Sequence, residues 1–371
     1  MTKPFAVLVM STPVGPLGSG VGGGVEATLS SVVRGLSARG HRVEVVAPAG
    51  SRPIGVPMHC PGGDPQPPAQ FVDRSTVTET SGSSVLVNMW AAVRDLCHGF
   101  DAVLNLAYDA LPFDESFEMG RPVAHIVSMA SLTDEMDAAI DNVLRAAPAT
   151  VAMHSQAQAA TFVRGSGATI IGGGVDVEGF VFVDRAHADG RVAFVGRVSP
   201  EKGLRDVVHA CRLAGRPLHV WGYMQHDDEW AASVEGADEG SVVYRGFVDA
   251  RRLGAELGEC TALVMAPKWV EAFGNVAVEA MACGVPVVSY RRGGPAEVVV
   301  DGENGFLVDA DDVAGLAAAL GRVGALSRRA CRTSAAENHS VEALAGRVEA
   351  WLDGVLGGRP RVDFAAPPLS F

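Results

Sequence analysis

Short apolar runs alternate with amphipathic segments along the first half of the chain. Residues 5–10 and 41–48 are predicted as buried strands, and residues 24–40 between them place their apolar side chains on one face of a helix. Three more strands are predicted in this half, at residues 101–107, 122–130 and 150–155. Strands and helices that alternate in this way are typical of a parallel sheet covered by helices on both faces.

The second half of the chain repeats the alternation. A strand at residues 191–196 precedes an amphipathic helix, and residues 275–284 and 340–358 have the pattern of further helices. The remaining strands are predicted at residues 217–223, 241–249, 261–267, 285–290 and 302–308. The pattern therefore predicts an α/β protein with two doubly wound parallel-sheet units in series.

Glycine and charged residues interrupt the periodicity between the two halves, in GGGVDVEGFVFVDRAHADG. We predict an N-terminal domain over residues 1–175, a linker over 176–190 and a C-terminal domain over 191–350. Residues 351–371 are predicted as a tail that packs back toward the N-terminal domain. Residues 50–84 are rich in Pro, Gly and Ser, and a loop of this length is either functional or mobile.

Composition and charge narrow the class of protein. The 371 residues are 48% hydrophobic, which is enough for two cores, and a net charge of −13 argues against a nucleic-acid partner. The six cysteines form no C-x-x-C pair, which favours reduced thiols in the cytoplasm over disulfides or a zinc site. The sequence has neither a convincing secretory signal nor an apolar run of roughly 20 residues, so we expect no transmembrane segment.

The glycine-rich stretch GPLGSGVGGGVEATL contains the G-x-G-x-x-G spacing of a dinucleotide-binding fingerprint, at Gly18, Gly20 and Gly23. Two features argue against that interpretation. An excursion with two prolines separates the first strand from Gly18, and Glu44 lies inside the second strand rather than at its end. Glycine N–H groups that lead into a helix still form a concave anion site, so we expect an anion near residues 22–24. The alternative is a flexible loop without a ligand.

A pair of cations follows the first strand of the second half, in FVGRVSPEKGL. The strand delivers Arg197 to its carboxyl end, and Ser199 and Pro200 are a good helix start, which puts Lys202 in the first turn. A cation at that end of a helix opposes the helix dipole. An anion between the two cations and the first-turn amides removes the conflict, and a diphosphate is the natural candidate. The alternative is two solvated surface cations.

The stretch APKWVEAFGNVAVEAMACGVPVVSY carries two carboxylates around a helix start. Glu271 precedes the helix, which is predicted to begin at Gly274 and Asn275 and to end at Gly284, and Glu279 lies on its second turn. Carboxylates accept hydrogen bonds from pairs of hydroxyls, and helix N–H groups donate to phosphate or sugar oxygens. This combination suits a polyol that carries a phosphate, and plain helix capping explains only one of the two carboxylates.

These residues resemble a known family. The E-x7-E spacing, with FVGRVSPEKG, FGNVAVEAMACGVPVV, RRGGPAEVV and DGENGFLV, resembles the retaining GT-B nucleotide-sugar glycosyltransferases of family 4, also called glycosyl transferases group 1. The GGVE loop and the GH-x-V strand of the first half fit as well. The resemblance covers residues 5 to about 355, and its C-terminal motifs are the more specific.

The resemblance implies two Rossmann-like domains that face each other across a cleft, with the donor mostly on the C-terminal one and the acceptor on the N-terminal one. Arg197 and Lys202 would hold the donor diphosphate, Glu279 the ribose hydroxyls and Glu271 the transferred sugar. Arg197, Lys202 and Glu271 are thus the predicted catalytic residues. The full set of predicted donor-binding residues is Gly23, Gly24, Arg197, Lys202, Glu271, Phe273, Gly274, Asn275, Val276 and Glu279.

The first half departs from the family at the acceptor side. The family often has a His after its PVV strand, but alignment of PVAHIVSMA puts Ser128 there and His125 inside the strand. An H-x-H-like element is replaced by Asn105 and Tyr108. We place Ser128, His125 and Tyr108 on the acceptor side, and a structural role is favoured over a catalytic one for His125 and His154.

Metal and cofactor requirements follow from the same resemblance. Asp309 and Asp311 have the spacing of a metal-binding DxD, but they follow a strand and open a helix, where acidic residues complement the dipole. We therefore predict a metal-independent hexosyltransferase without a cofactor. Retention is implied by the family, in which a leaving phosphate oxygen is thought to take the acceptor proton, so no protein base is named.

Two rival functions stay open at this point. A nucleotide-sugar 2-epimerase on the same fold also needs diphosphate cations, and an inactive nucleotide-sugar-binding protein is the non-enzyme alternative. A phosphorylase is disfavoured because no lysine is placed for a pyridoxal Schiff base. The partners expected are a nucleotide-sugar donor and a hydroxyl acceptor, which is a small molecule, specialised metabolite, lipid or saccharide, and a homodimer stays open.

Overall fold

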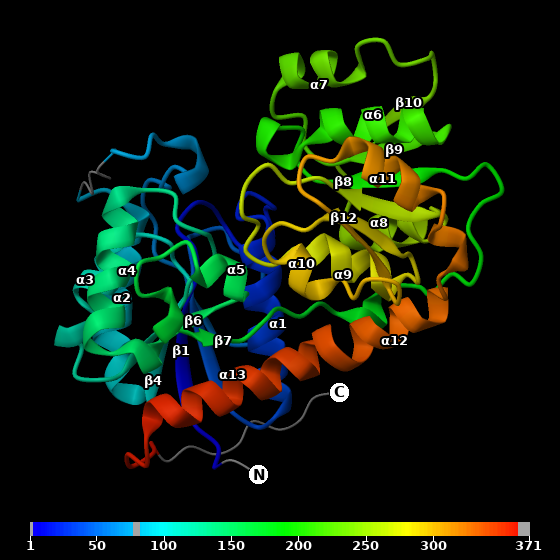
Figure 1. Cartoon of the computed structure of the whole chain (residues 1–371). Coiled ribbons are helices and arrows are strands. Elements are labelled where there is room, and N and C mark those ends of the chain that lie inside the picture. The colour runs from blue at the N-terminus through cyan, green and yellow to red at the C-terminus, as the bar shows by residue number, and fades with distance from the viewer. Residues whose placement is uncertain (1–2, 77–81, 363–371) are drawn as a thin grey trace. The chain divides into compact units, whose positions relative to one another are not determined.

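The structure is a computed structural model that describes residues 3–76 and 82–362. The chain divides into two compact units, coloured along the chain in Figure 1. Unit 1 comprises Met1–Gly173 and Val341–Phe371, and unit 2 comprises Gly174–Ser340. The C-terminal segment thus returns to the first unit, and each unit is described by itself below.

Unit 1 is built on a parallel sheet in the order β3-β2-β1-β4-β5-β6-β7, counted over its described residues. The strands are β1 (Ala6–Met10), β2 (Arg42–Val46), β3 (Met58–His59), β4 (Ala102–Asn105), β5 (Val123–Ile126), β6 (Val151–Met153) and β7 (Thr169–Ile170). The helices are α1 (Gly24–Ala38), α2 (Val85–Leu96), α3 (Ala110–Asp114), α4 (Asp134–Ala146), α5 (Gln156–Ala159) and α13 (Val341–Leu356). The order reverses between β1 and β4, which is where doubly wound sheets bind ligands.

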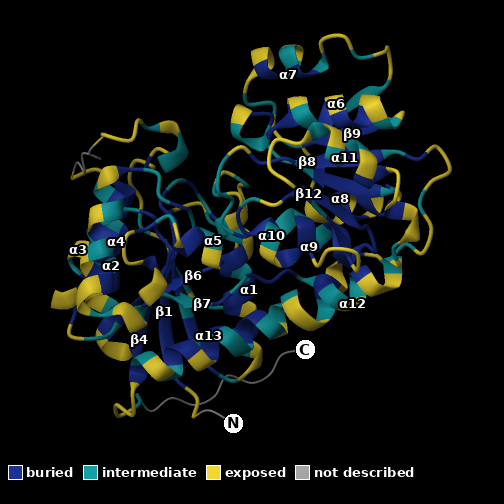
Figure 2. Cartoon of the chain, in the orientation of Figure 1, coloured by how far each residue is buried: buried dark blue, intermediate teal, exposed yellow. Residues whose placement is uncertain are grey.

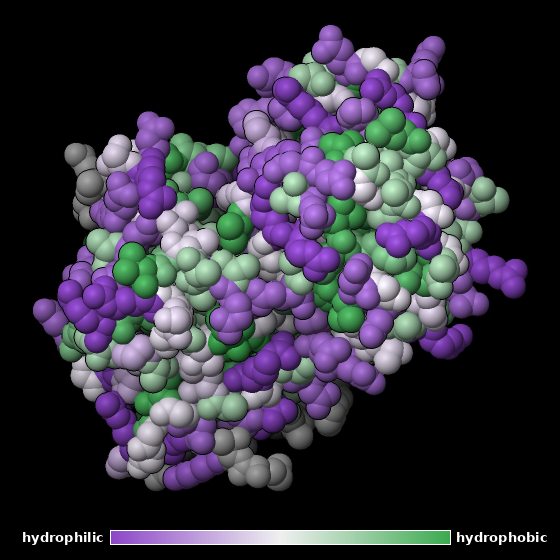
Figure 3. All heavy atoms as spheres, viewed as in Figure 1, coloured by the Kyte–Doolittle hydropathy of each residue, from purple (hydrophilic) through white to green (hydrophobic). Residues whose placement is uncertain are grey.

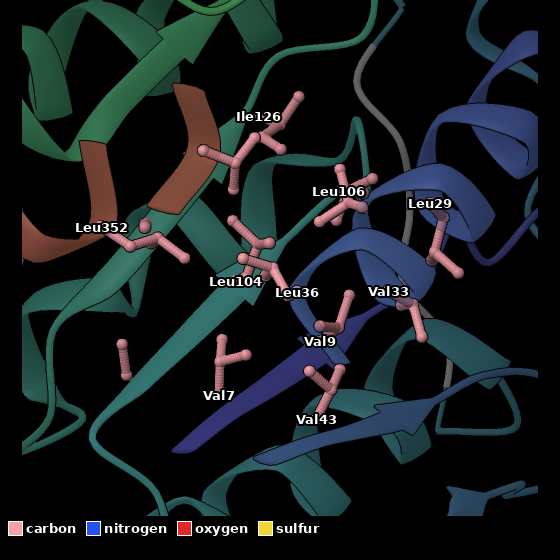
Figure 4. Packing of buried hydrophobic residues seen from close by; sticks show 14 of the residues in the cluster. Val7, Val9, Leu29, Val33, Leu36, Val43, Leu104, Leu106, Ile126 and Leu352 are labelled. Carbon is pink, nitrogen blue, oxygen red and sulfur yellow. The ribbon is translucent and has the colours of Figure 1, made fainter. Parts of the chain in front are cut away.

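The strand side chains alternate between two cores in unit 1. Val7 and Val9 of β1 pack against the apolar faces of α1 and α13, whereas Leu8 packs against α2 on the other face of the sheet. Figure 4 shows the first of these cores, with Leu36 of α1 and Leu352 of α13 among its members. Burial of both faces explains why these strands read as continuous apolar runs.

Helix α13 is tied to α1 by a close contact and by an ion pair whose carboxylate, Glu349, is buried. A Cβ at Gly35 would lie 2.4 Å from the Cβ of Ala345, so only glycine lets the two helices approach at this point. The Glu349 carboxylate accepts a hydrogen bond from Arg39 Nε at 2.7 Å and lies 3.1 Å from His41 Nε2. Burial lowers the pKa of His41 despite that carboxylate, so the imidazole is neutral at pH 7.

Unit 2 is built on a second parallel sheet, with the strand order β10-β9-β8-β11-β12-β13. The structure describes every residue of this unit. Its strands are β8 (Val192–Val195), β9 (Leu218–Trp221), β10 (Val242–Gly246), β11 (Ala262–Met265), β12 (Val287–Tyr290) and β13 (Gly305–Val308). Its helices are α6 (Leu204–Ala214), α7 (Asp227–Val234), α8 (Ala250–Gly258), α9 (Asn275–Ala282), α10 (Pro295–Val298), α11 (Val313–Leu320) and α12 (Arg328–His339). Here the order reverses between β8 and β11.

Helices cover both faces of this sheet as well. Phe194 of β8 belongs to the core under α6 and α11, whereas its neighbour Ala193 belongs to the core under α8, α9 and α12. In Figure 2 most of the central strands and the inward faces of the helices are dark blue, and the outward faces are mostly yellow. The predicted fold class, an α/β protein with two doubly wound parallel sheets, is therefore confirmed for each unit.

The unit boundaries differ from the predicted ones. Residues 176–190, predicted as a linker, belong to unit 2, because Val177 and Phe180 are buried in its core and the Val183 N–H donates to the Cys283 carbonyl at 3.0 Å. Residues 341–350, predicted in the C-terminal domain, belong to unit 1, because they form the first part of α13. Of the predicted tail, residues 363–371 lie outside the described part of the chain.

The surface has mixed polarity. The face shown in Figure 3 is mostly hydrophilic, with hydrophobic residues in small groups. Within the described residues, no helix combines the length and the apolar character that a membrane crossing requires.

Candidate active site

The cationic end of the site lies just after β8. Gly196 follows the strand, and Arg197 donates to Gln225 Oε1 and to Glu201 Oε1, both at 2.9 Å. Ser199 was predicted as a helix N-cap. It holds the N-cap position of the turn, but its hydroxyl donates to Glu201 Oε1 at 2.7 Å instead of accepting from a backbone N–H. Lys202 ends a 3₁₀ turn ahead of α6 rather than lying in the first turn of an α-helix, and this corrects the sequence prediction.

The turn ends where it does because of backbone geometry. Gly203 has φ of +69°, a left-handed conformation, and a Cβ there would lie 2.0 Å from the Ala266 carbonyl oxygen. Lys202 is therefore held against the loop that follows β11, the neighbour of β8 in the sheet. Since the carboxyl ends of parallel strands meet at one edge, this reversal point brings the two loops together.

Lys202 and Glu271 meet directly. Lys202 Nζ lies 2.6 Å from Glu271 Oε2, and the two side chains are 21% and 19% exposed. Trp269 Nε1 donates to the same oxygen at 2.9 Å, and Lys202 Nζ lies 5.0 Å from the centre of the Trp269 ring. Burial on its own raises the pKa of Glu271, but attraction to Lys202, the two hydrogen bonds and the charge of Arg197 bring it below its ordinary value. Glu271 is thus a carboxylate at neutral pH.

Two glycines support the loop that carries Glu271. A Cβ at Gly293 would lie 2.6 Å from the Glu271 nitrogen, and a Cβ at Gly294 would lie 2.4 Å from the Phe273 Cα. The Gly294 N–H donates to the Glu271 carbonyl at 2.7 Å. The RRGGPAEVV motif therefore acts as a backbone support for the carboxylate loop, because no larger residue fits there.

Helix α9 begins and ends as the sequence predicts. Gly274 is its N-cap in a left-handed conformation, Asn275 and Val276 are its first residues, and Gly284 follows the end with φ of +85°. Phe273 is buried and contacts the His339 ring edge-on at 5.6 Å. The first-turn amides of α9 therefore follow directly after the loop that carries Glu271, and no side chain caps them at Gly274.

Glu279 lies one turn after Asn275, on the same side of α9. Its carboxylate is half-buried and has no hydrogen bond or ion pair with any residue that the structure describes. Burial raises the pKa of Glu279 to about 7. An unpaired, half-buried carboxylate beside a helix start is costly in the free protein, and a ligand with hydroxyl donors would relieve that cost.

A separate ion network joins α6 to the loops that follow β11, β12 and β13. Lys268 contacts Asp206 at 2.5 Å and Asp311 at 2.8 Å, and Arg292 contacts Asp311 at 2.6 Å. Asp311 lies ahead of α11, as predicted, and Asp312 caps that helix by accepting from the Gly315 N–H at 2.8 Å. The Asp311 carboxylate thus has two cationic partners in unit 2, and metal independence stays a prediction.

The glycine loop of unit 1, residues 18–24, binds a carboxylate of the same chain. Glu26, in the first turn of α1, accepts hydrogen bonds from the N–H groups of Gly18 at 2.7 Å and Gly22 at 2.8 Å, and more weakly from Gly20 at 3.4 Å. Glu26 belongs to the GGVE motif, but the sequence pattern did not single it out. The anion expected near residues 22–24 is, in this structure, the carboxylate of the chain itself.

Gly23 and Gly24 form the start of α1. Gly23 is its N-cap with φ of +57°, and a Cβ at this position would meet no atom within 4 Å. The described residues therefore leave the space next to Gly23 open. A role for the two glycines in donor binding stays a prediction.

The three residues predicted on the acceptor side differ in accessibility. His125 is fully buried, stacks on Phe113 at 4.1 Å and lies 3.2 Å from the Asn105 amide through Nδ1. Tyr108 is 9% exposed and donates its hydroxyl to the Ala130 carbonyl. In this conformation neither side chain presents a polar group to an acceptor, because both are enclosed. Ser128 alone of the three is partly exposed.

His154, predicted as structural, is also buried. Its Nδ1 lies 2.7 Å from the Gly172 carbonyl oxygen. Burial lowers the pKa of His154, so its imidazole is neutral at pH 7.

Comparison with known proteins places this site in a family. Residues 189–325 match the family described as Glycosyl transferases group 1. The D-inositol 3-phosphate glycosyltransferase of Mycobacterium marinum is 33% identical over 271 residues, which are 65% of this chain and 56% of that protein. The match lies within unit 2 and, with the relatives, supports a group 1 glycosyltransferase. The glycogen synthase of Mycobacterium tuberculosis is 35% identical over 163 residues, 41% of this chain and 38% of the synthase.

Solved structures place the chain in the GT-B fold of two Rossmann-like domains. Anabaena Alr3699/HepE in complex with UDP has a TM-score of 0.72 at 19% identity, covering 94% of this chain and 100% of that one. AviGT4, a glycosyltransferase involved in avilamycin A biosynthesis, has a TM-score of 0.69 at 19% identity, covering 96% and 99%. The chain spans little more than half the length of the Mycobacterium marinum relative that it matches.

The sequence did not predict the role of Trp269 in the unit 2 site. Trp269 lies two positions before Glu271, inside the quoted stretch, and its indole N–H binds the Glu271 carboxylate. The signal was a lone aromatic residue in a loop between a strand and a helix. Sequence alone does not tell an indole that binds a carboxylate from one that fills the core.

Proposed function

We propose that this chain is a retaining glycosyltransferase that moves a sugar from a nucleotide diphosphate sugar to a hydroxyl acceptor. The observation that carries the proposal is the grouping in unit 2 of Arg197, Lys202 and Glu271 around the reversal point of the sheet. The two cations and the N–H groups at the start of α9 suit a diphosphate. The carboxylate suits the hydroxyls of a sugar joined to that diphosphate.

Each residue has a proposed role on the donor. Arg197 and Lys202 bind the diphosphate, Glu271 accepts hydrogen bonds from hydroxyls of the transferred sugar, and Glu279 accepts from the ribose. The amides of Phe273, Gly274 and Asn275 complete the sugar pocket, with Val276 beside them. The unpaired carboxylate of Glu279 supports its role, since two adjacent hydroxyls supply the donors that it lacks in the free protein.

The proposed transfer breaks the bond between the anomeric carbon and the diphosphate oxygen and forms a bond from that carbon to the acceptor oxygen. Positive charge develops on the sugar and negative charge on the leaving diphosphate. Lys202 and Arg197 stabilise that leaving charge more strongly than they stabilise the ground state. A leaving phosphate oxygen takes the acceptor proton, so the step balances without a protein base.

The test is to incubate the full chain with UDP-, GDP- and dTDP-sugars and to measure release of the nucleoside diphosphate. UDP-sugars come first, because the neighbouring Anabaena structure was solved with UDP. Slow release by the wild type, lost in Lys202→Met, supports the proposal. An interconverted nucleotide sugar indicates an epimerase, and binding without turnover indicates a binding protein.

A further inference from the structure

Trp269 shares one oxygen of Glu271 with Lys202. The indole N–H and the ammonium both bind Oε2, at 2.9 Å and 2.6 Å. The other oxygen, Oε1, has no hydrogen-bond partner among the residues that the structure describes. Two donors on one oxygen fix the plane of the carboxylate and leave Oε1 as its available acceptor.

The two donors differ in what they can do when an anion arrives. Lys202 is a flexible ammonium with three N–H groups and is the residue that the diphosphate attracts. The indole has a single N–H on a rigid ring and no charge, so a diphosphate does not compete strongly for it. The bond from Trp269 to Oε2 is therefore the one that persists when Lys202 turns to the donor.

From this geometry we propose that Trp269 is a positioning residue that holds Glu271 with Oε1 directed to the transferred sugar. The inference rests on the proposed function and adds a residue to it. Loss of the indole N–H lets the carboxylate follow Lys202 toward the diphosphate, so the sugar loses its acceptor. The nucleotide part of the donor keeps all of its contacts.

Trp269→Phe is the decisive variant, because it removes the N–H and keeps an aromatic ring beside Lys202. Trp90→Phe in unit 1 is the matched control: its indole makes the same kind of bond, to Glu115 Oε2 at 2.7 Å. Circular dichroism and thermal melting establish that both variants are folded. Titration calorimetry on the full chain then compares UDP with UDP-glucose, or whichever pair the wild type binds.

We expect Trp269→Phe to weaken binding of the nucleotide sugar about tenfold, the usual effect of one hydrogen bond to a charged group. Its affinity for the nucleoside diphosphate stays within about twofold of the wild type. Trp90→Phe leaves both affinities unchanged. Equal losses for the two ligands, or none for either, would overturn the role of Trp269, whereas a wild type that binds neither refutes the proposed function.

A second measurement decides the inference without any ligand. Lys202, Arg197 and the indole N–H all favour the ionised form of Glu271. Removal of the indole therefore raises the pKa of this carboxyl, and carbon NMR of labelled glutamate side chains follows the change in the free protein. A Glu271 titration that is the same in Trp269→Phe and wild type contradicts the positioning role, even if sugar binding weakens.

Discussion

Replacing Glu279 by glutamine removes an unpaired carboxylate from the start of α9 and keeps the shape of the side chain. Burial raises the pKa of this group to about 7 from an ordinary value of 4.5. The folded protein therefore holds a proton on Glu279 more tightly than the unfolded chain does. Stability contributed by this group is present below pH 4.5 and is lost as the pH rises to about 7.

The size of the loss follows from the two pKa values. Each pH unit between them corresponds to about 1.4 kcal/mol, so the full span is worth about 3 kcal/mol at pH 8 as an upper limit. Glutamine carries no charge and avoids this penalty. We expect Glu279→Gln and wild type to be equally stable near pH 4.5 and the variant to be more stable at pH 8, by about 1–3 kcal/mol.

Urea denaturation of the full chain at pH 5, 6, 7 and 8 measures this difference. The control is Glu337→Gln, an exposed glutamate on α12 of the same unit. A stability gain for Glu279→Gln that grows with pH, absent from the control, supports the assignment. If the gain is the same at every pH, Glu279 is paired or solvated in solution, and the argument that it awaits hydroxyl donors is wrong.

Three other substitutions test separate parts of the structure. Glu271→Gln should lower sugar transfer about a hundredfold or more in a turnover assay and change nucleoside diphosphate affinity only a few-fold, since the proposed ligand of Glu271 is the sugar and not the diphosphate; a turnover near that of wild type would exclude Glu271 from the site. Glu26→Gln should speed hydrogen exchange of the glycine-loop amides and cost about 1 kcal/mol, whereas unchanged exchange shows that the loop does not need its internal anion. Glu349→Ala removes the acceptor of Arg39 and His41 and should cost about 1–2 kcal/mol by urea denaturation at pH 7, because the Arg39 charge stays exposed to solvent; a loss near zero would show that α13 is held by packing alone.

Much of the fold could be predicted because both faces of each sheet are covered. Continuous apolar runs such as residues 5–10 then mark strands, and the helices between them show a clear period. The short strands β3 and β7, at Met58–His59 and Thr169–Ile170, were missed because two residues carry no periodicity. The boundary at residue 350 was misplaced because α13 resembles any amphipathic helix, and only its packing on α1 assigns it to unit 1.

The sequence predicted which charged residues form the site, but it did not predict which side chains bind one another. The motifs placed Lys202 and Glu271 after two separate strands, and the structure shows that these strands are neighbours and that the two side chains meet. Sequence cannot show that Glu26 fills the glycine loop or that Trp269 binds Glu271, because both are side-chain conformations set by tertiary contacts. His125 is enclosed for the same reason: its place in β5 was predicted, but its neighbours were not.

Binding of nucleoside diphosphates to the full chain tests the central claim most directly. Titration calorimetry with UDP, GDP and dTDP should find one that binds, and Lys202→Met should weaken it about tenfold or more, the usual effect of losing a charge-assisted contact. Lys3→Met, at an exposed position outside the site, should leave binding unchanged. If no nucleoside diphosphate binds, or if Lys202→Met binds as tightly as the wild type, the assignment of the donor site to unit 2 is contradicted.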